Sequence, residues 1–208
     1  MTAPPPPARV WVMLSGDPRR NIVLRRGPTA QVAAFNWDRT SNRITLGQWL
    51  KGRVFFTRCD ISPDGEHWAY FAMGRSASTY TVVAKTPFMT ALDFFEGCGT
   101  WDRGAAFLGN GEYAVYCSLD GPKNYRTSGL RVAAQGPAPL HRRLLSQGWE
   151  PQSADMFQKP AQGPWRLVKR VGQPRGRADR AVDTESHALI HTDTGDCIER
   201  PSWEWADA

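Results

Sequence analysis

The 208-residue sequence has no long apolar run and no closely spaced pair of cysteines. No apolar stretch approaches the roughly 18 to 20 residues that a membrane-spanning helix needs, and residues 1–7 lack the basic flank and apolar core of a signal peptide. We therefore expect a cytoplasmic protein without membrane contact. The cysteines at positions 59, 98, 117 and 197 form no Cys-x-x-Cys pair, which argues against a disulfide scaffold or zinc ribbon and favours buried thiols.

Familiar catalytic motifs are also missing. The sequence has no Gly-x-Ser-x-Gly elbow, no phosphate-binding glycine loop ending in Gly-Lys, no His-Glu-x-x-His and no dinucleotide-binding glycine fingerprint. These absences remove the most recognisable enzymes without excluding an enzyme, and no cofactor is expected. With 41% hydrophobic residues, 22% charged residues and a net charge of +6, the composition is that of a soluble globular protein.

Short β-branched and aromatic runs, separated by Gly, Pro, Asn or Asp, predict an all-β fold of many short antiparallel strands. Residues 1–7 are expected to form a disordered Pro-rich leader before a single β domain of residues 8–208. Only residues 140–147 have the spacing of a short helix. The expected strands are 10–14, 21–25, 31–37, 43–46, 53–61, 67–73, 80–85, 92–95, 105–108, 113–119, 130–134, 156–159, 165–171, 186–192 and 197–200.

An internal near-repeat is the most informative pattern. The segment 60–70 lies over the segment 106–116 with a shift of 46 residues, and a looser third copy covers 160–168. Each copy reads as a strand, a glycine-containing turn and a more apolar strand. Asp64-Gly65 and Asn110-Gly111 tolerate the positive φ of tight turns, so each is predicted to close a hairpin. The run from His67 to Met73 lacks polar alternation, which predicts a strand buried on both faces between stacked sheets.

Tryptophans recur with a similar period. Trp49, Trp101, Trp149 and Trp203 are spaced 52, 48 and 54 residues apart, close to the length of a β-propeller blade. We interpret the fold as a propeller-like array of about four to five small antiparallel sheets, with these four tryptophans as core wedges. Trp11, Trp37 and Trp205 are expected to be more exposed. Because about 200 residues make closure of a ring marginal, open curved sheets, a β-sandwich and a dimer remain alternatives.

Two sets of residues carry a family resemblance. The motif Ile61-Ser62-Pro63-Asp64-Gly65, followed by an aromatic strand, resembles the Ser-Pro-Asp-Gly hairpin of the WD-repeat and TolB-type propeller superfamily. The wider pattern is similar to a group of uncharacterised bacterial proteins, and this resemblance implies a propeller-like fold but brings no activity. That pattern comprises Leu24-Arg25-Arg26-Gly27-Pro28, Trp37-Asp38, the segment 47–53 (Gly-Gln-Trp-Leu-Lys-Gly-Arg), the Ser-Pro-Asp-Gly turn, Gly148-Trp149 and Trp165.

The charges are unevenly distributed near the C-terminal end. Segment 165–180 has a formal charge of +5, whereas segment 181–208 has a formal charge of −6. An arginine cluster suits phosphate or an acidic partner, although the acidic segment beside it could equally neutralise it. A smaller basic cluster contains Arg19, Arg20, Arg25 and Arg26. The predicted partner-binding residues are Arg166, Lys169, Arg170, Arg175, Arg177, Arg180 and Trp205.

Two groups of ionisable residues carry weaker hypotheses. If the segment 183–193 is extended, its odd positions share one face, but residues four apart on a strand lie roughly 13 Å apart, too far to share one metal ion. No metal site is therefore predicted there. The residues around the first hairpin are general acid or base candidates. These groups are Asp183, Glu185, His187, His191 and Asp193 on the strand, and Asp60, Asp64, Glu66 and His67 at the hairpin.

The leading functional hypothesis is a non-enzymatic binding or scaffold protein that presents loops to a macromolecular partner. A protein is the preferred partner, and nucleic acid is the second class. The alternatives are a hydrolase with a loop-lined funnel site and a nucleic-acid-binding protein that uses the Arg-rich segment 166–180.

Overall fold

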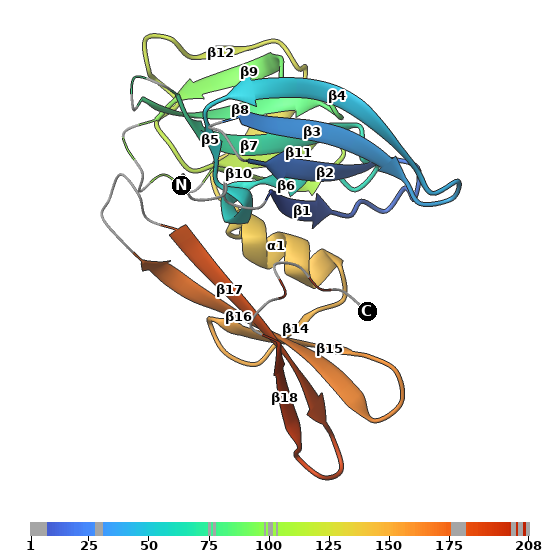
Figure 1. The fold of residues 1–208 in the computed structure, drawn as a ribbon. Coiled ribbons are helices and arrows are strands. Elements are labelled where there is room, and N and C mark those ends of the chain that lie inside the picture. Colours follow the sequence, from blue (N-terminus) through green and yellow to red (C-terminus); the bar gives the residue numbers. More distant parts are fainter. Residues whose placement is uncertain are drawn as a thin grey trace, which may run out of the picture. The chain divides into compact units, whose positions relative to one another are not determined.

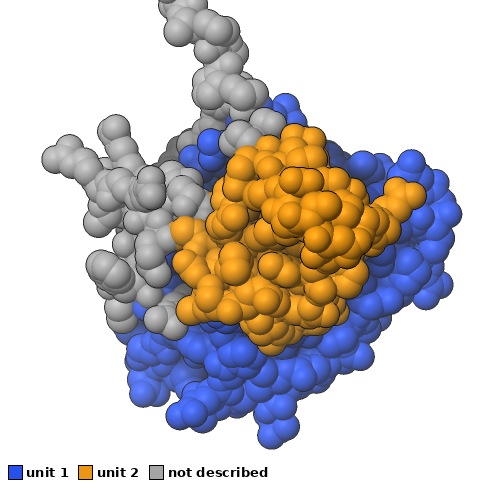
Figure 2. Space-filling model, turned by 90° about the horizontal axis from the view of Figure 1, so that it is seen from below, with its two compact units in different colours: residues 1–143 blue, residues 144–208 orange. Residues whose placement is uncertain are grey.

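The computed structural model describes most of the chain as two compact units, residues 1–143 and 144–208, coloured separately in Figure 2. The fold is all-β, and the described residues include one short α-helix, α1 (Pro139–Ser146). The predicted leader, residues 1–7, lies outside the description. The described residues are 8–27, 31–74, 76, 78–97, 99, 102, 104–175, 182–200, 203 and 206, with backbone only for 173–175 and 182–184.

The described residues of the first unit form three sheets. Sheet A is an antiparallel meander of β1 (Arg9–Met13), β2 (Asn21–Arg26), β3 (Gln31–Asp38) and β4 (Arg43–Lys51). Sheet B has the order β12 (Tyr125–Arg126), β9 (Ala91–Glu96), β8 (Thr79–Lys85), β7 (His67–Met73) and β5 (Arg53–Val54), and β6 (Asp60–Ile61) also pairs with β7. Sheet C consists of β10 (Ala105–Gly109), β11 (Glu112–Val115) and β13 (Arg131–Ala133).

Sheet B is the middle layer of this unit, as the arrangement in Figure 1 illustrates. Trp68 and Tyr70 of β7 pack with Ile22 and Leu24 of sheet A in one core cluster. Ala69, the residue between them, belongs to a second cluster with sheet C. Because successive side chains of a strand point to opposite faces, β7 is buried on both sides. The prediction of a doubly buried strand between stacked sheets is confirmed.

Both predicted hairpins are present, with a difference in detail. Gly65 has a φ of +70° in the turn between β6 and β7, and a Cβ there would lie 2.5 Å from the carbonyl oxygen of Arg20. Asn110 and Gly111 form the two-residue connection of β10 and β11, but neither takes a positive φ. The hairpins also meet, since the Asp64 backbone N–H donates to Asn110 Oδ1 at 3.0 Å. The two repeat copies therefore lie side by side.

The second unit contains a five-stranded antiparallel meander, sheet D. Its buried side chains include Phe157, Val168, Ala188 and Trp149, so the core-wedge prediction is confirmed for Trp149. The third repeat copy is a hairpin, with Gly163 at a φ of +63° in its turn. The strands are β14 (Glu150–Pro151), β15 (Met156–Pro160), β16 (Trp165–Arg175), β17 (Val182–His191) and β18 (Cys197–Arg200).

The sheets contain four, six, three and five strands rather than equal blades, and the described residues show no closed or propeller arrangement. The two-residue strands β12 and β14 were not predicted, because two residues are too few to show an alternating pattern. The expected strand 53–61 is interrupted by a 3-10 turn, Phe56–Arg58. Of the cysteines, Cys59 is buried as expected, whereas Cys117 is half-buried and Cys197 is exposed.

Candidate functional site

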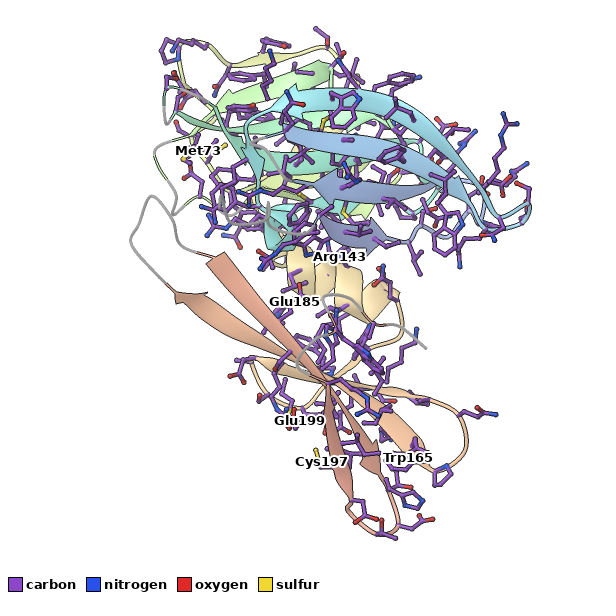
Figure 3. The ribbon with its side chains drawn as sticks, in the orientation of Figure 1. Met73, Arg143, Trp165, Glu185, Cys197 and Glu199 are labelled. Atoms are coloured by element: carbon purple, nitrogen blue, oxygen red, sulfur yellow. The ribbon has the colours of Figure 1, made fainter. Side chains whose placement is uncertain are left out.

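The Arg-rich segment lies on sheet D, where its described basic side chains are paired with acids. Lys169 is almost fully buried, and its Nζ lies 3.1 Å from Glu185 Oε2. Arg170 pairs with Glu199 at 3.1 Å. Figure 3 labels both glutamates, which come from different strands of this sheet. The segment 181–208 therefore supplies acids to two of the predicted partner-binding residues, as the neutralisation alternative expected.

The remaining predicted residues of this patch divide into two groups. Arg166 pairs with Glu150 of β14. The backbone of Arg175 ends β16, but its side chain lies outside the described residues, as do Arg177, Arg180 and Trp205 entirely. Partner binding by Arg175, Arg177, Arg180 and Trp205 therefore stays a prediction.

The side chains of both histidines of β17 contact nearby backbone groups. His187 is fully buried; its Nδ1 lies 3.0 Å from the carbonyl oxygen of Trp203, and burial lowers the pKa of its imidazole. His191 Nδ1 accepts the backbone N–H groups of Asp193 and Thr194, both at 3.3 Å, and so closes the turn after the strand. Within the described part of the chain, no three His, Cys, Asp or Glu side chains are grouped to hold a metal ion.

The four acid or base candidates near the first hairpin have different surroundings. Asp64 Oδ1 accepts from Ser62 Oγ at 2.6 Å and from the Glu66 backbone N–H, which is the usual role of an aspartate in a turn. Glu66 forms an exposed pair with Arg20. Burial lowers the pKa of His67. The fourth candidate, Asp60, faces sheet C and α1 instead of the turn.

Asp60 is a fully buried carboxylate with two cross-chain partners. Its Oδ2 accepts the backbone N–H of Phe107 at 2.8 Å, and its Oδ1 accepts from Arg142 Nη1 at 3.1 Å. The same guanidinium donates to the carbonyl oxygen of Ile61, while Arg143 donates to that of Cys59 at 2.9 Å. Two successive arginines of α1 therefore bind β6 and the residue before it, which is a structural role.

Asp60 also makes stability depend on pH. Burial raises the pKa of Asp60 from 3.8 to about 6, against the opposing effect of Arg142. Between about pH 4 and pH 6 the folded state therefore binds more protons than the unfolded state, so the free energy of unfolding decreases as pH rises, by about 3 kcal/mol from this group. Urea denaturation at several pH values measures this slope. The lowered pKa values of His67 and His187 contribute a slope of the opposite sign, so the contribution of Asp60 is the difference in slope between wild type and Asp60→Asn, and equal slopes in both proteins would contradict the assignment.

The surface that differs most from the sequence prediction is the outer side of sheet A, the side away from sheet B. The register places an apolar row of Val12, Val23, Phe35 and Leu46 across all four strands. Trp37 and Ile44 pair on one side of this row, and Val10, Arg25, Ala33 and Trp49 form the row on the other side. We call these ten residues the outer apolar face; in the view of Figure 1, sheet A lies in front of sheet B.

Much of the outer apolar face is open to solvent. Ile44 is 57% exposed, Leu46 55%, Trp49 48% and Val10 42%. The prediction that Trp49 is a core wedge is wrong, because this tryptophan projects from the side of sheet A that none of the other described sheets of the unit covers. Trp37 is half-buried and Trp11 stacks on Phe56, so neither is strongly exposed. Trp203 is half-buried, and Trp101 lies outside the described residues.

The surroundings of this face are basic. Residues 8–53 contain nine arginines and lysines but only two aspartates, a formal charge of +7, which is larger than that of segment 165–180. Two of these basic residues, Arg43 and Lys51, are the first and last residues of β4. Both are exposed, and neither forms an ion pair within the described chain. An apolar face with a basic surround is suited to a partner that is both apolar and acidic.

Comparison with known proteins adds no assignment: no protein-family model matches the chain, and neither does any curated protein. Among the described residues, no helix has the length and apolar character required to cross a bilayer. The geometry of the chain itself is therefore the basis for a functional proposal.

Proposed function

We propose that this chain is a non-enzymatic binding or scaffold protein that docks a macromolecular partner on the outer apolar face of sheet A. The observation that carries the proposal is the exposure of four apolar side chains, Val10, Ile44, Leu46 and Trp49, on one face. The partner is proposed to be a protein, and the compartment to be the cytoplasm.

The exposure of these side chains supports this proposal. Val10, Ile44, Leu46 and Trp49 are between 42% and 57% exposed on one side of a sheet, and the largest exposed apolar surface of a protein is often a binding site. Tryptophan is also one of the residues that most often carries binding energy when it is buried in an interface. Exposure of this area is costly in water, so the face is better explained by a partner than by the stability of the isolated sheet.

We propose further that residues 8–143 form an open relative of propeller-like arrays, as the resemblance to the WD-repeat and TolB-type superfamily implied. Face-to-face stacking of three sheets supports this relationship. A second support is the hydrogen bond between Asp64 and Asn110, equivalent positions of the two repeat copies. In an open array the terminal sheet keeps one uncovered face, and here that face is the outer apolar face.

Capture from a cell lysate tests the binding role. We expect the tagged protein to retain a stoichiometric protein partner after nuclease treatment, and Leu46→Glu to lose the same partner because a carboxylate cannot be buried in an apolar contact. Leu119→Glu is the matched control, since Leu119 is 50% exposed and lies outside sheet A. Mass spectrometry of the captured proteins gives the comparison.

Two results would count against this function. Equal capture by wild type and Leu46→Glu would remove the outer apolar face from the interaction. Loss of every partner on nuclease treatment would instead support nucleic-acid binding and direct attention to the Arg-rich segment 166–180.

A further inference from the structure

One edge of sheet A is the outer side of β4, and the inference drawn from it rests on the proposed function. Strand β4 ends the sheet order and pairs only with β3 among the described residues. Its other edge therefore presents backbone N–H and C=O groups that no described strand satisfies. Such an edge is a template for a further strand unless it is covered or interrupted.

The open part of this edge is the segment Arg43 to Leu46. All four of its residues are exposed, and they pair in register with Asp38 to Phe35 of β3. The pairing then shifts, and Gly47 lies so close to Pro87 that a Cβ would clash with the Pro87 carbonyl oxygen. This contact and the shift in register mark the end of the regular stretch.

The two faces of this stretch differ in character. Ile44 and Leu46 belong to the outer apolar face, whereas Arg43 and Thr45 point to the opposite face because side chains alternate along a strand. Arg43 has no ion-pair partner within the described chain, since the carboxylate of Asp38 accepts from Thr40 and Ser41. An added strand therefore meets apolar side chains on one face and an unpaired cation on the other.

We propose that β4 binds an extended segment of the partner protein by strand addition, and that this segment alternates apolar and acidic residues. Its apolar side chains pack beside Ile44 and Leu46, and its acidic side chains lie beside Arg43. Cross-strand apolar and opposite-charge pairs both stabilise neighbouring strands, so the pattern of β4 selects the complementary pattern in its partner.

Charge and side-chain type decide against two other occupants. A second copy would bring two regions of +7 together, which is unfavourable without acids between them. A single-stranded nucleic acid binds by stacking its bases on aromatic rings, but Trp49 is the one aromatic residue among the four strongly exposed side chains of the outer apolar face. An acidic polypeptide with aliphatic side chains fits both the positive charge of this region and its mainly aliphatic exposed side chains.

A fluorescein-labelled peptide of four Glu-Val repeats tests the proposal by anisotropy with the full chain. We expect saturable binding that weakens with salt, a loss of about tenfold or more in Leu46→Glu, and no change in Leu119→Glu. Arg43→Glu is expected to weaken binding of this peptide about three- to fivefold and to strengthen binding of a Lys-Val repeat, which a merely structural role of Arg43 would not produce.

Strand addition is separated from simple contact by N-methylation of the peptide. In an added strand only one of its two edges donates to β4, so methylation of the valine nitrogens and methylation of the glutamate nitrogens must have opposite outcomes, one abolishing binding and the other preserving it. Equal effects of the two modifications would overturn strand addition, and no binding of the unmodified peptide would do the same.

Two further measurements test the other occupants. Light scattering that shows a dimer in wild type and a monomer in Leu46→Glu would overturn the proposal in favour of a second copy. Competition by a single-stranded oligodeoxynucleotide at the same site would favour nucleic acid. If the peptide fails while Leu46→Glu still loses its captured partner, the proposed function stands and strand addition falls; if capture ignores Leu46→Glu, the function itself falls.

Discussion

Replacement of Asp60 by alanine is expected to lower the free energy of unfolding by about 3–5 kcal/mol at neutral pH, because removal of one partner of a buried ion pair leaves the other charge without compensation. Arg142 has a side chain that is 14% exposed, so water relieves little of its charge once the carboxylate is gone. The backbone N–H of Phe107 also loses its acceptor. Urea denaturation of the full chain, followed by circular dichroism, measures the change.

A surface pair provides the matched control. Glu112 pairs with Arg131, whose side chain is 76% exposed, and Glu112→Ala is expected to cost less than about 1 kcal/mol. The double variant Asp60→Ala/Arg142→Leu is expected to recover part of the lost stability, since it removes the uncompensated charge. Similar losses in Asp60→Ala and Glu112→Ala would show that the pair is hydrated in solution and would also remove the basis of the predicted pH dependence.

Features encoded by neighbouring residues were predictable. Asp64-Gly65 is a pair that strongly favours a turn, and the unbroken apolar run of β7 indicates burial on both faces wherever the strand lies in the fold. The position of Trp149 in a core was also correctly inferred, although from a spacing that placed Trp49 wrongly. Local patterns therefore identify strands and turns, but a spacing of about 50 residues does not by itself determine which side of a sheet is covered.

Features that depend on distant residues were not predictable. Asp60 is hydrogen-bonded to residues 47 and 82 positions later in the chain, and nothing near it in the sequence distinguishes it from an exposed turn residue. The outer apolar face has a weaker local signal, since Ile44 and Leu46 alternate with Arg43 and Thr45 as in a strand with one apolar side. Which side of that strand faces the core follows only from the stacking of sheet A on sheet B.

Two tryptophans that look alike in the sequence are expected to respond oppositely to mutation. Trp68 is fully buried between sheets A and B, its ring lies 4.8 Å from that of Tyr70, and its Nε1–H donates to the Phe88 carbonyl oxygen at 2.7 Å. Trp68→Ala is expected to cost about 3–5 kcal/mol, through the cavity and the lost hydrogen bond. Trp49→Ala is expected to change stability by no more than about 0.5 kcal/mol, because the side chain is at the surface.

Urea denaturation gives both values, and acrylamide quenching of fluorescence reports the exposure independently. Trp49→Ala is expected to remove a strongly quenched component, and Trp68→Phe to leave that component in place while costing less than Trp68→Ala, because phenylalanine fills most of the cavity. If Trp49→Ala proves as destabilising as Trp68→Ala, and increasingly so at higher protein concentration, then a second copy covers the outer apolar face in solution. A small effect at all concentrations instead leaves this face open for a different partner, which is the condition that strand addition to β4 requires.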